Sequence, residues 1–334
     1  MFILDWKNIT GVHCGSVAIR NVINYFGTDY PEELCFGLGA GMGFFYNKNN
    51  ESKPSEVIHL RAPNMEPIFF SSTGRDYKWL KEKDSSIAHD RLIENITKGF
   101  PVFLQTDLFY LKYYNSSLHF PGHVVVCIGY DKKNKLFYLS DTNFKEIQTA
   151  SFSQLNNARN SKAEPYPLSY NYFVVKKFTA FRDLKERVEL ATFKNSFNFL
   201  KGQESDRGIS SVFAILECAN NIKKWNELPD KRDVFKFAYQ IIAKRGSKGA
   251  GFRFIYEDFL DLAQVYSSKI KRLNLKIDMH EIALGWVSIA SLMKQIYIKG
   301  NNLNLIKLEN SLTDIYSKEF NFHMKVLDEF SNKN

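Results

Sequence analysis

The chain has 334 residues, 44% of them hydrophobic and 15% aromatic, which fits a globular protein with one large domain or two domains. Its net charge of +9 favours acidic partners, although the lysines serve equally well to solvate helix faces. No apolar run is long enough to cross a bilayer and the start is unlike a signal peptide, so we expect neither a membrane-spanning helix nor secretion. The cysteines are far apart and form no C-x-x-C pair, which indicates a reducing compartment: Cys14, Cys35, Cys127 and Cys218. We therefore expect a cytoplasmic protein.

The predicted strands lie in the first half of the chain, where short β-branched and aromatic runs are bounded by turn residues. Such runs occupy residues 101–106, 124–130, 136–140 and 172–178. The polar stretch 131–135 joins the second run to the third, which predicts an antiparallel hairpin.

From about residue 181 the apolar residues recur with helical spacing. The expected helices are 182–201, 208–228, 232–245, 252–273, 279–299 and 303–330. Asp230 and Asp278 are the expected N-caps, and Gly246 and Gly300 the expected helix ends. The sequence thus predicts an α+β domain with an antiparallel sheet at residues 1–180, followed by an all-α domain at 181–334.

A cysteine stands at the start of the first amphipathic helix. Beyond Cys14, apolar residues fall at helical spacing and Gly27 follows as a stop. A helix N-terminus carries partial positive charge and free N–H donors, which favour a thiolate and stabilise an oxyanion. The same local pattern is also typical of a buried structural cysteine.

A histidine and an aspartate on the predicted hairpin are the candidate partners of this thiol. His123 begins the strand at 124–130, and Asp141 ends the strand at 136–140. The expected registers pair residues whose numbers sum to about 264 or 266, and both place these two side chains on one face. A slip of one residue would separate them. Cys14 as nucleophile, His123 as base and Asp141 as the group that orients the base form the candidate triad.

Other candidate sites are weaker. His13 is adjacent to Cys14 and points elsewhere on a helix. His119 and His123 have zinc-like spacing, but Pro121-Gly122 interrupts any helix between them, so no metal site is expected. Cys127 fits a strand interior. The glycine-rich run 37–43 lacks the features of a phosphate loop and instead permits close backbone approach beside an active site.

Several of these segments resemble the butirosin biosynthesis protein H family. The resemblance rests on His13-Cys14 at a helix start, the run 33–39, Gly122-His123 and Ser140-Asp141. The helical half, around residues 251–260, resembles the domain that commonly follows in that family. The resemblance implies a papain-like, cysteine-peptidase-type fold for the N-terminal domain.

The resemblance also implies acyl transfer. A carrier-protein phosphopantetheine thioester would deliver an acyl group to Cys14, and a small-molecule amine would then take it to form an amide, with no bound cofactor. His123 would shuttle the proton and Asp141 would orient His123. The glutamine that papain-like peptidases place upstream of the cysteine is missing from positions 5–13. Asn8 or backbone N–H groups at the helix start would replace it.

The remaining candidate oxyanion or substrate contacts are His13, Gly39 and Gly41. An acidic carrier protein would suit a basic chain, and the expected docking residues are the pairs 223–224, 231–232 and 244–245. Nucleic acid and membranes are not expected partners. The leading hypothesis is amide-forming acyl transfer in natural-product biosynthesis. A cysteine peptidase or amidohydrolase with the same triad, and a non-catalytic binding protein on the same fold, are the alternatives.

Overall fold

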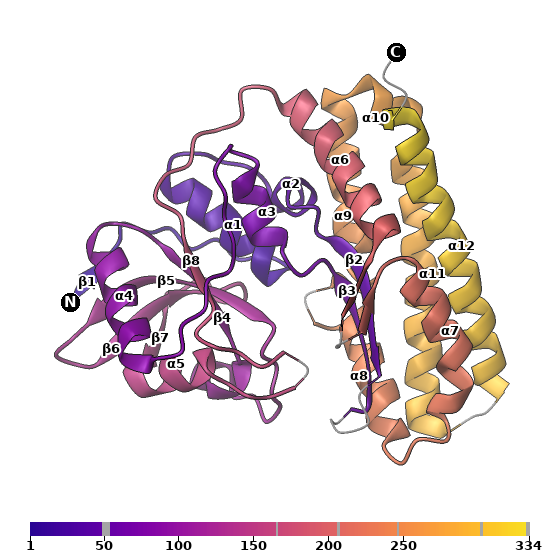
Figure 1. Cartoon of the computed structure of the whole chain (residues 1–334), viewed down its shortest axis with the longest axis horizontal. Helices are drawn as coiled ribbons and strands as arrows, with labels where there is room; N and C mark the ends of the chain where they lie inside the picture. The colour runs from indigo at the N-terminus through magenta and orange to yellow at the C-terminus, as the bar shows by residue number, and fades with distance from the viewer. Residues whose placement is uncertain (49–53, 165, 206–207, 246, 301–302, 332–334) are drawn as a thin grey trace. The chain divides into compact units, whose positions relative to one another are not determined.

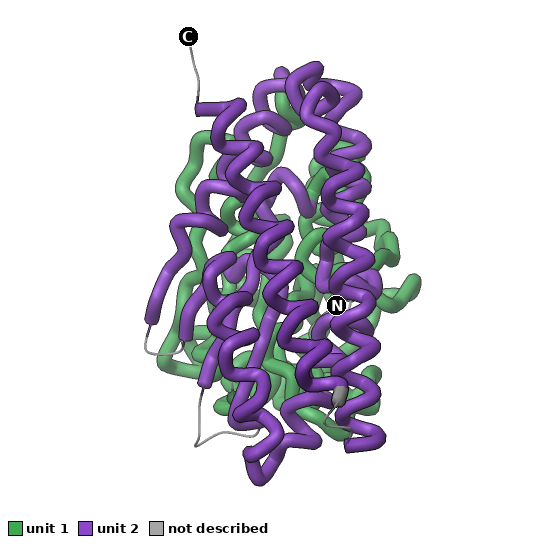
Figure 2. The backbone as a smooth tube through the Cα atoms, turned by 90° about the vertical axis from the view of Figure 1, so that its right-hand side faces the viewer, with its two compact units in different colours: residues 1–35, 64–181 green, residues 36–63, 182–334 purple. Residues whose placement is uncertain are grey.

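The computed structural model describes residues 1–48, 54–164, 166–205, 208–245, 247–300 and 303–331 (Figure 1). The chain forms two compact units (Figure 2). Unit 1 consists of Met1–Cys35 and Asn64–Phe181, and unit 2 of Phe36–Pro63 and Arg182–Asn334. One crossing between the units lies at 181/182, next to the expected division at 180/181. Residues 36–63, however, belong to the helical unit and not to the first domain.

Unit 1 is built around an antiparallel sheet of strand order β7-β6-β5-β4-β8, with β1 pairing β5 beyond the end of β4. Its strands are β1 (Phe2–Ile3), β4 (Val102–Thr106), β5 (His123–Asp131), β6 (Leu136–Ser140), β7 (Gln148–Ser151) and β8 (Tyr172–Val174). Its helices are α1 (Cys14–Tyr25), α3 (Met65–Ser71), α4 (Ser85–Thr97), the 3-10 turns η1 (Leu108–Tyr110) and η2 (Lys112–Tyr114), and α5 (Phe152–Arg159). Helix α2 (Glu32–Leu38) begins in unit 1 and ends in unit 2.

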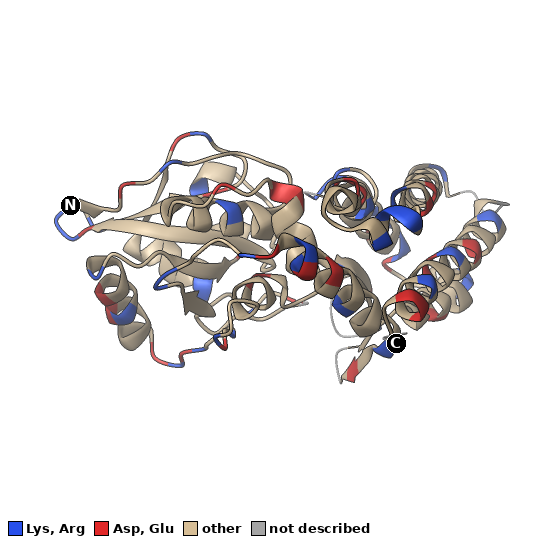
Figure 3. Cartoon of the chain, turned by 90° about the horizontal axis from the view of Figure 1, so that it is seen from above, with Lys and Arg blue, Asp and Glu red and all other residues tan. Residues whose placement is uncertain are grey.

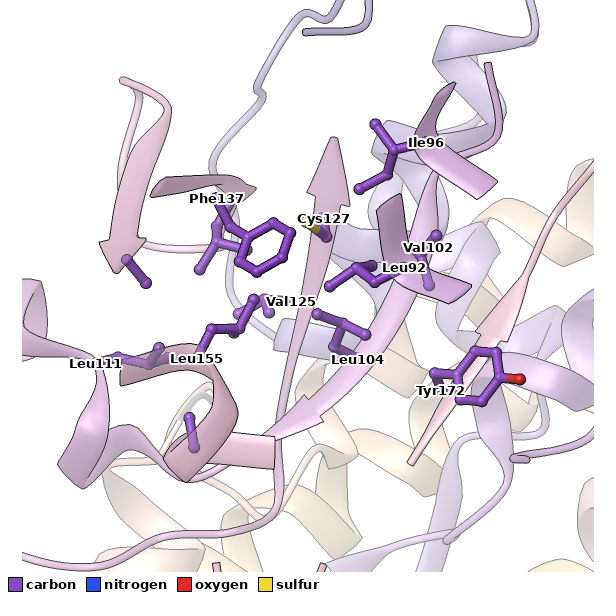
Figure 4. Close-up of a cluster of buried hydrophobic side chains, with 13 residues drawn as sticks. Leu92, Ile96, Val102, Leu104, Leu111, Val125, Cys127, Phe137, Leu155 and Tyr172 are labelled. Carbon is purple, nitrogen blue, oxygen red and sulfur yellow. The ribbon is translucent and has the colours of Figure 1, made fainter. Parts of the chain in front are cut away.

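The core of unit 1 lies where α4 and α5 meet the sheet (Figure 4). Alternate residues of β4 and β5 point into it, because side chains of a strand alternate between its faces. The cluster includes Leu92, Ile96, Val102, Leu104, Val125, Cys127, Phe137, Leu139 and Leu155. The free Cys127 is therefore a core residue, as its strand position predicted.

The predicted β5–β6 hairpin is confirmed, and its register changes along its length. Near the open end, Val126 pairs with Ser140 and Cys127 with Leu139, so the numbers sum to 266 as one expected register requires. Past an irregularity between Cys127 and Gly129, Tyr130 pairs with Phe137 and the sum becomes 267. The one-residue slip thus occurs at the turn end of the hairpin, and His123 and Asp141 keep a common face.

Unit 2 combines helices with a small antiparallel sheet of order β3-β2-β10-β9. Its strands are β2 (Met42–Lys48), β3 (Glu56–Arg61), β9 (Gln203–Ser205) and β10 (Gly208–Ser210). Its helices are α6 (Leu184–Lys201), α7 (Phe213–Trp225), α8 (Lys231–Ala243), α9 (Arg253–Tyr266), α10 (Ser268–Arg272), α11 (Leu275–Lys299) and α12 (Leu303–Ser331).

The β2–β3 hairpin belongs to unit 2 because its large side chains pack on helices of that unit. Phe44 stacks on Trp286 with ring centroids 5.6 Å apart, and Tyr46 packs against Trp225. All four rings are almost completely buried. The α+β class is confirmed, but the second half is not purely helical, since β10 pairs with β2 where a helix was expected from residue 208.

Helix boundaries follow local capping. The helix expected at 252–273 is two helices, because Ser267 caps α10 through Ile270 N–H. Asp278 lies in the first turn of α11 and is not its N-cap. Asp230 is at the N-cap position of α8, but its carboxylate accepts hydrogen bonds from Ser55. Gly300 ends α11 with a left-handed φ of 63°, as expected. Gly246, the other expected helix end, lies outside the described residues.

None of the helices in the described part of the chain combines the length and apolar character needed for a bilayer crossing.

Candidate active site

Cys14 is the first residue of α1, as its sequence pattern predicted, and its side chain is partly exposed. His13 is the N-cap: its Nδ1 accepts a hydrogen bond of 3.2 Å from Ser16 N–H. The N–H groups of Cys14 and Gly15 belong to the first turn, where an α-helix offers no intrahelical acceptor. The thiol thus lies beside free backbone donors of a helix N-terminus.

His123 and Asp141 form a buried pair at the open end of the β5–β6 hairpin. The His123 Nε2 lies 2.9 Å from Asp141 Oδ1 and 3.0 Å from Oδ2. Both residues are at most 5% exposed. Burial alone would lower the pKa of His123, but the charge and hydrogen bonds of Asp141 outweigh it and raise the pKa to about 10. The same ion pair holds the pKa of Asp141 below its usual value despite burial.

Cys14 reaches this pair. A hydrogen bond and charge interaction with the Cys14 thiol add to the raised pKa of His123. Because Nε2 faces Asp141, Nδ1 is the ring nitrogen that remains for the sulfur. The structure therefore brings together the three residues predicted as a triad, in the order thiol, imidazole, carboxylate.

Two neighbouring tyrosines, missed in the sequence, complete the surroundings of Asp141. From η2, the Tyr113 hydroxyl donates to Asp141 Oδ2 at 2.8 Å and the Tyr114 hydroxyl to Oδ1 at 2.9 Å. Thr142 N–H also donates to Oδ1 at 2.6 Å. Burial and the Asp141 charge raise the pKa of both phenols, which keeps them protonated as donors. Tyr-Tyr in an irregular loop carries no sequence signal that would reveal this role.

Two family models match this chain. The one described as butirosin biosynthesis protein H, N-terminal, matches residues 13–142, a segment that contains all three predicted triad residues. The one described as a domain of unknown function (DUF4872) matches residues 153–326, more than half of the chain. The chain belongs to the DUF4872 family and carries the butirosin biosynthesis protein H N-terminal domain in front of it, which confirms the resemblance seen in the sequence. The name of the first domain relates it to antibiotic biosynthesis. None of the curated proteins matches the chain.

Asn8 is not the oxyanion donor that the departure from papain-like peptidases suggested. Its amide nitrogen donates to the carbonyls of Asp141 and Phe144, which uses both of its hydrogens. Its Oδ1 accepts from Asn21 and Ser140. Asn8 therefore fixes the chain around Asp141, and the backbone N–H groups of α1, the other predicted oxyanion donors, stay a prediction.

The segment before the nucleophile is held by Glu32 of α2. Its carboxylate accepts hydrogen bonds from Val12 N–H, from His13 N–H at 2.8 Å and from the Ser16 hydroxyl at 3.0 Å. Gly11 is required beside it, because a Cβ there would lie 2.1 Å from Glu32 Oε2. Sequence reasoning missed Glu32, although it follows Pro31 at a helix start.

Gly15, directly after the nucleophile, is also constrained. A Cβ at Gly15 would lie 2.1 Å from Oε1 of Glu66, a carboxylate that is fully buried at the start of α3. The first turn of α1 thus meets two carboxylates, Glu32 and Glu66. These place negative charge close to the positive end of the helix dipole.

The other predicted contacts lie elsewhere. His13 acts as a cap through its ring, as described above. Gly39 and Gly41 lie in unit 2, in the turn between α2 and β2, where Gly41 N–H donates to Phe36 O and Gly41 O accepts from Ala62 N–H. Their proposed substrate contacts stay predictions.

The other three cysteines, all among the described residues, are free and fully buried. Burial raises the pKa of Cys127 to about 12 and also raises the pKa values of Cys35 and Cys218. Of the four thiols, Cys14 is thus the one with access to solvent and a basic partner.

His119, the other half of the zinc-like spacing, has a different carboxylate. Its Nδ1 lies 2.6 Å from Asp107 Oδ2, which also accepts from the Ser161 hydroxyl at 2.6 Å. Asp107 further accepts from Phe120 N–H, so it ties the two ends of the loop that carries Tyr113 and Tyr114. Among the described residues no group of three or more His, Cys, Asp or Glu side chains is placed to hold a metal ion.

Proposed function

We propose that this chain is a cysteine-dependent acyltransferase that forms an amide bond in natural-product biosynthesis. The observation that supports it most is the buried His123–Asp141 pair with the Cys14 thiol on the imidazole. The match of residues 13–142 to the butirosin biosynthesis protein H model supports a biosynthetic role for this arrangement. Unit 1 carries all three residues and is the proposed catalytic domain.

In the first half-reaction the Cys14 sulfur attacks the carbonyl carbon of a phosphopantetheine thioester on a carrier protein. His123 takes the proton of the Cys14 thiol, the bond from that carbon to the phosphopantetheine sulfur breaks, and His123 gives the proton to the departing thiolate. The acyl group is then held as a thioester on Cys14. The N–H groups of Cys14 and Gly15 are the proposed donors to the oxyanion.

In the second half-reaction the nitrogen of a small-molecule amine attacks the acyl-Cys14 carbonyl. His123 takes the proton released by the nitrogen, the bond from carbon to Cys14 sulfur breaks, and the amide departs. Asp141 orients the imidazole in both halves and stabilises the imidazolium. No resident cofactor is needed, because the thioester supplies the activated acyl group.

The proposed donor is an acidic carrier protein, which the net charge of +9 would attract. The helices of unit 2 carry both positive and negative side chains (Figure 3), and the charged residues of α10 are all basic: Lys269, Lys271 and Arg272. Of the expected docking residues, Lys223 pairs with Glu309 at 2.7 Å, and Arg245 is half-buried against Phe237. The remaining residues of those pairs are the better docking candidates. Nucleic acid and membranes stay outside the proposal.

A cytoplasmic location is part of the proposal. The four cysteines are free, and three of them are buried without a disulfide partner. Such thiols suit a reducing compartment.

Intact-protein mass spectrometry after incubation with acyl-loaded carrier protein or simple acyl thioesters tests the proposal. We expect a mass gain of one acyl group on the wild type, discharged by an amine with formation of the amide. Cys14→Ala should gain no mass. His123→Gln should acylate slowly, whereas the matched control His280→Gln, which changes an exposed histidine of α11, should behave as the wild type.

Other outcomes decide between reaction types. If acyl-Cys14 were hydrolysed in the presence of every amine tested and no amide formed, the same triad would be that of a hydrolase and not of an acyltransferase. An adduct of equal size on Cys14→Ala would contradict the assignment of the nucleophile. No adduct with any donor, on a protein that is folded by circular dichroism, would contradict the acyl-enzyme mechanism.

A further inference from the structure

Asp107 is a fully buried carboxylate that takes no part in the proposed mechanism. It follows β4 directly, and four donors in the described part of the chain contact it. Its Oδ1 accepts from Phe109 N–H at 3.1 Å and from Phe120 N–H at 2.8 Å. Its Oδ2 accepts from His119 Nδ1 and from the Ser161 hydroxyl, both at 2.6 Å. A buried carboxylate needs such donors, so the chain around Asp107 is tightly constrained.

These contacts close the long connection between β4 and β5. The two strands pair up to Thr106 and His123, and residues 107–122 lie between them. Phe109 and Phe120 are near opposite ends of this loop, and both donate to the one carboxylate. Leu108 N–H also donates to Phe120 O at 3.3 Å. A surface loop whose ends are held together in this way is compact, and loops of this kind are often functional.

The middle of the loop contacts the proposed triad. The Tyr113 and Tyr114 hydroxyls donate to the two oxygens of Asp141, and the Tyr114 ring lies edge-on to the His123 ring with centroids 5.3 Å apart. The loop then ends where β5 begins, at His123. Its closed ends are thus connected to the triad by two routes, the tyrosine hydroxyls and the start of β5.

We propose that Asp107 is a positioning residue for the triad, because it closes the loop that holds the Tyr113 and Tyr114 hydroxyls on Asp141. It acts through other residues, since none of its four donors belongs to the triad. The inference rests on the proposed function, because it assigns a further role at the same site. Displacing a catalytic group by about 1 Å can slow a reaction strongly, so a residue that shapes the loop can control the rate.

Asp131 offers a matched comparison, because it closes a turn of the same unit at the other end of β5. It is 6% exposed and accepts hydrogen bonds from Asn134 N–H at 3.0 Å and from Asn134 Nδ2 at 2.9 Å. That turn does not carry the tyrosines. Asp131→Ala should therefore lower stability and leave His123 unaffected, which is the result expected of a purely structural aspartate.

The first test measures His123 without any substrate. Asp107→Ala removes the acceptor of all four donors, so the loop should open and admit water to the pair of His123 and Asp141. The wild-type pKa of His123 is raised to about 10, and water should lower this pKa by about 1 or more, toward the ordinary value of about 6.5. Asp107→Asn keeps an oxygen for the two backbone donors and should give a smaller change of the same sign. NMR titration of the imidazole resonances measures the change, and Asp131→Ala should show none.

The second test asks whether Asp107 acts through the tyrosines. In acyl transfer, Asp107→Ala should lower kcat by about 10-fold with little change in KM, because it displaces catalytic groups and not the substrate. In a background that carries Tyr113→Phe and Tyr114→Phe, the same substitution should cost only about 3-fold or less. The hydroxyls that Asp107 positions are already absent there, so the effects should not add.

An unchanged pKa of His123 in folded Asp107→Ala and Asp107→Asn would overturn the proposal. So would equal effects of Asp107→Ala with and without the tyrosine hydroxyls. If circular dichroism shows that Asp107→Ala does not fold, Asp107→Asn decides alone. If even the wild type forms no acyl-enzyme while the pKa of His123 falls as expected, the proposed function fails and the positioning role stands.

Discussion

Asp141 sits in a donor-rich environment that determines the protonation state of His123. Tyr113, Tyr114 and Thr142 N–H all donate to its carboxylate, in addition to the imidazole. Each donor favours the charged carboxylate over the neutral acid. A buried carboxylate that stays ionised in turn keeps the proton on His123, next to the Cys14 sulfur.

Replacing Asp141 with Asn should reverse the pKa shift of His123. The wild-type pKa is raised to about 10, so the imidazolium persists at neutral pH. In Asp141→Asn the effect of burial remains and the charge is gone, so we expect a pKa below about 6.5. NMR titration of the imidazole resonances measures this, and a His123 still protonated at pH 8 in the variant would contradict the account.

The same pair makes stability depend on pH. A histidine whose folded pKa is raised stabilises the protein below its unfolded pKa of about 6.5 and loses this contribution as pH rises through the folded value. The wild type should therefore lose free energy of unfolding between about pH 6.5 and pH 10. Urea denaturation of Asp141→Asn over the same range should show a smaller loss.

The tyrosines can be tested as positioning residues. Tyr113→Phe and Tyr114→Phe each remove one hydrogen bond to a buried charge, which should lower kcat/KM for acyl transfer by about 10-fold. The pH–rate profile should change shape as well, which a purely structural loss would not cause. Tyr130→Phe is the control, because its hydroxyl contacts Thr97 at the surface. Full activity in Tyr113→Phe and Tyr114→Phe would rule out the role.

The positions of the triad residues could be predicted, whereas their supports could not. Cys14 is marked by helix periodicity after it, and His123 and Asp141 by strand parity in a short hairpin. These are local patterns. Tyr113 and Tyr114 contact Asp141 from the short 3-10 turn η2. The side-chain amide of Asn8 donates both of its hydrogens to carbonyls more than 130 residues away in sequence. Such non-local hydrogen bonds leave no period or spacing in the sequence.

At the scale of elements, the start of α1 is positioned by α2. Glu32 satisfies the N–H groups of Val12 and His13 and the Ser16 hydroxyl. From α1, Arg20 donates to the carbonyls of Ile9 and Thr10. The segment 8–13 is thus held from both sides by polar contacts, which fixes the direction from which the chain enters the helix.

Removing the Glu32 carboxylate should therefore disturb both stability and activity. Glu32→Ala leaves buried donors without acceptors, at a cost of about 1–3 kcal/mol in the free energy of unfolding. Chemical denaturation measures this cost, and acylation of Cys14 should slow in the same variant. Glu33→Ala changes the adjacent carboxylate and serves as control. Equal effects of the two substitutions would show that the contacts of Glu32 have no special weight.

The β5–β6 hairpin shows how far element-level prediction extends. The odd numbers of His123 and Asp141 placed both side chains on one face of the hairpin. Near its open end the numbers of paired residues sum to 266, which agrees with that prediction. The irregularity near Gly129 was not visible in the sequence. A Cβ at Gly129 would lie 2.7 Å from Phe2 O, so the glycine admits β1 at that point. This contact joins Gly129 to the distant N-terminus, and a local pattern cannot contain it.

At the scale of the whole molecule, the β2–β3 hairpin contacts a buried ion pair between two helices of unit 2. Arg253 and Glu319 are fully buried and form two hydrogen bonds, of 2.8 and 3.1 Å. Arg253 also donates to Leu60 O in β3, and Trp286 Nε1 donates to Glu319. The motif around Gly251–Arg253, singled out in the sequence, thus anchors the hairpin.

Breaking this pair should destabilise unit 2 strongly. Arg253→Met leaves the Glu319 carboxylate buried without its partner, which should cost about 3–5 kcal/mol in the free energy of unfolding. The double variant Arg253→Met with Glu319→Leu should recover part of that loss, since it removes both charges. Thermal denaturation measures both. A double variant less stable than Arg253→Met would show that the carboxylate is not the source of the penalty.

Sequence periodicity recognised most of the helices of unit 2 but predicted no strand in residues 36–63 and assigned them to the first domain. Strands β2 and β3 are buried at nearly every position, and their sequence does not indicate which core buries them. Phe44 and Tyr46 pack on Trp286 and Trp225, some 180 to 240 residues further along the chain. Membership in a structural unit is decided by such long-range packing.

This hairpin has a practical consequence for exchanging parts between relatives. The chain passes between the two units after residues 35, 63 and 181. A chimera with a single junction near residue 181 would combine the helices of one relative with the β2–β3 hairpin of another. The hairpin would then face helices with which it does not normally pack. Residues 36–63 and 182–334 therefore form one structural unit that is encoded in two separate segments. We expect recombination that preserves function to exchange both segments together.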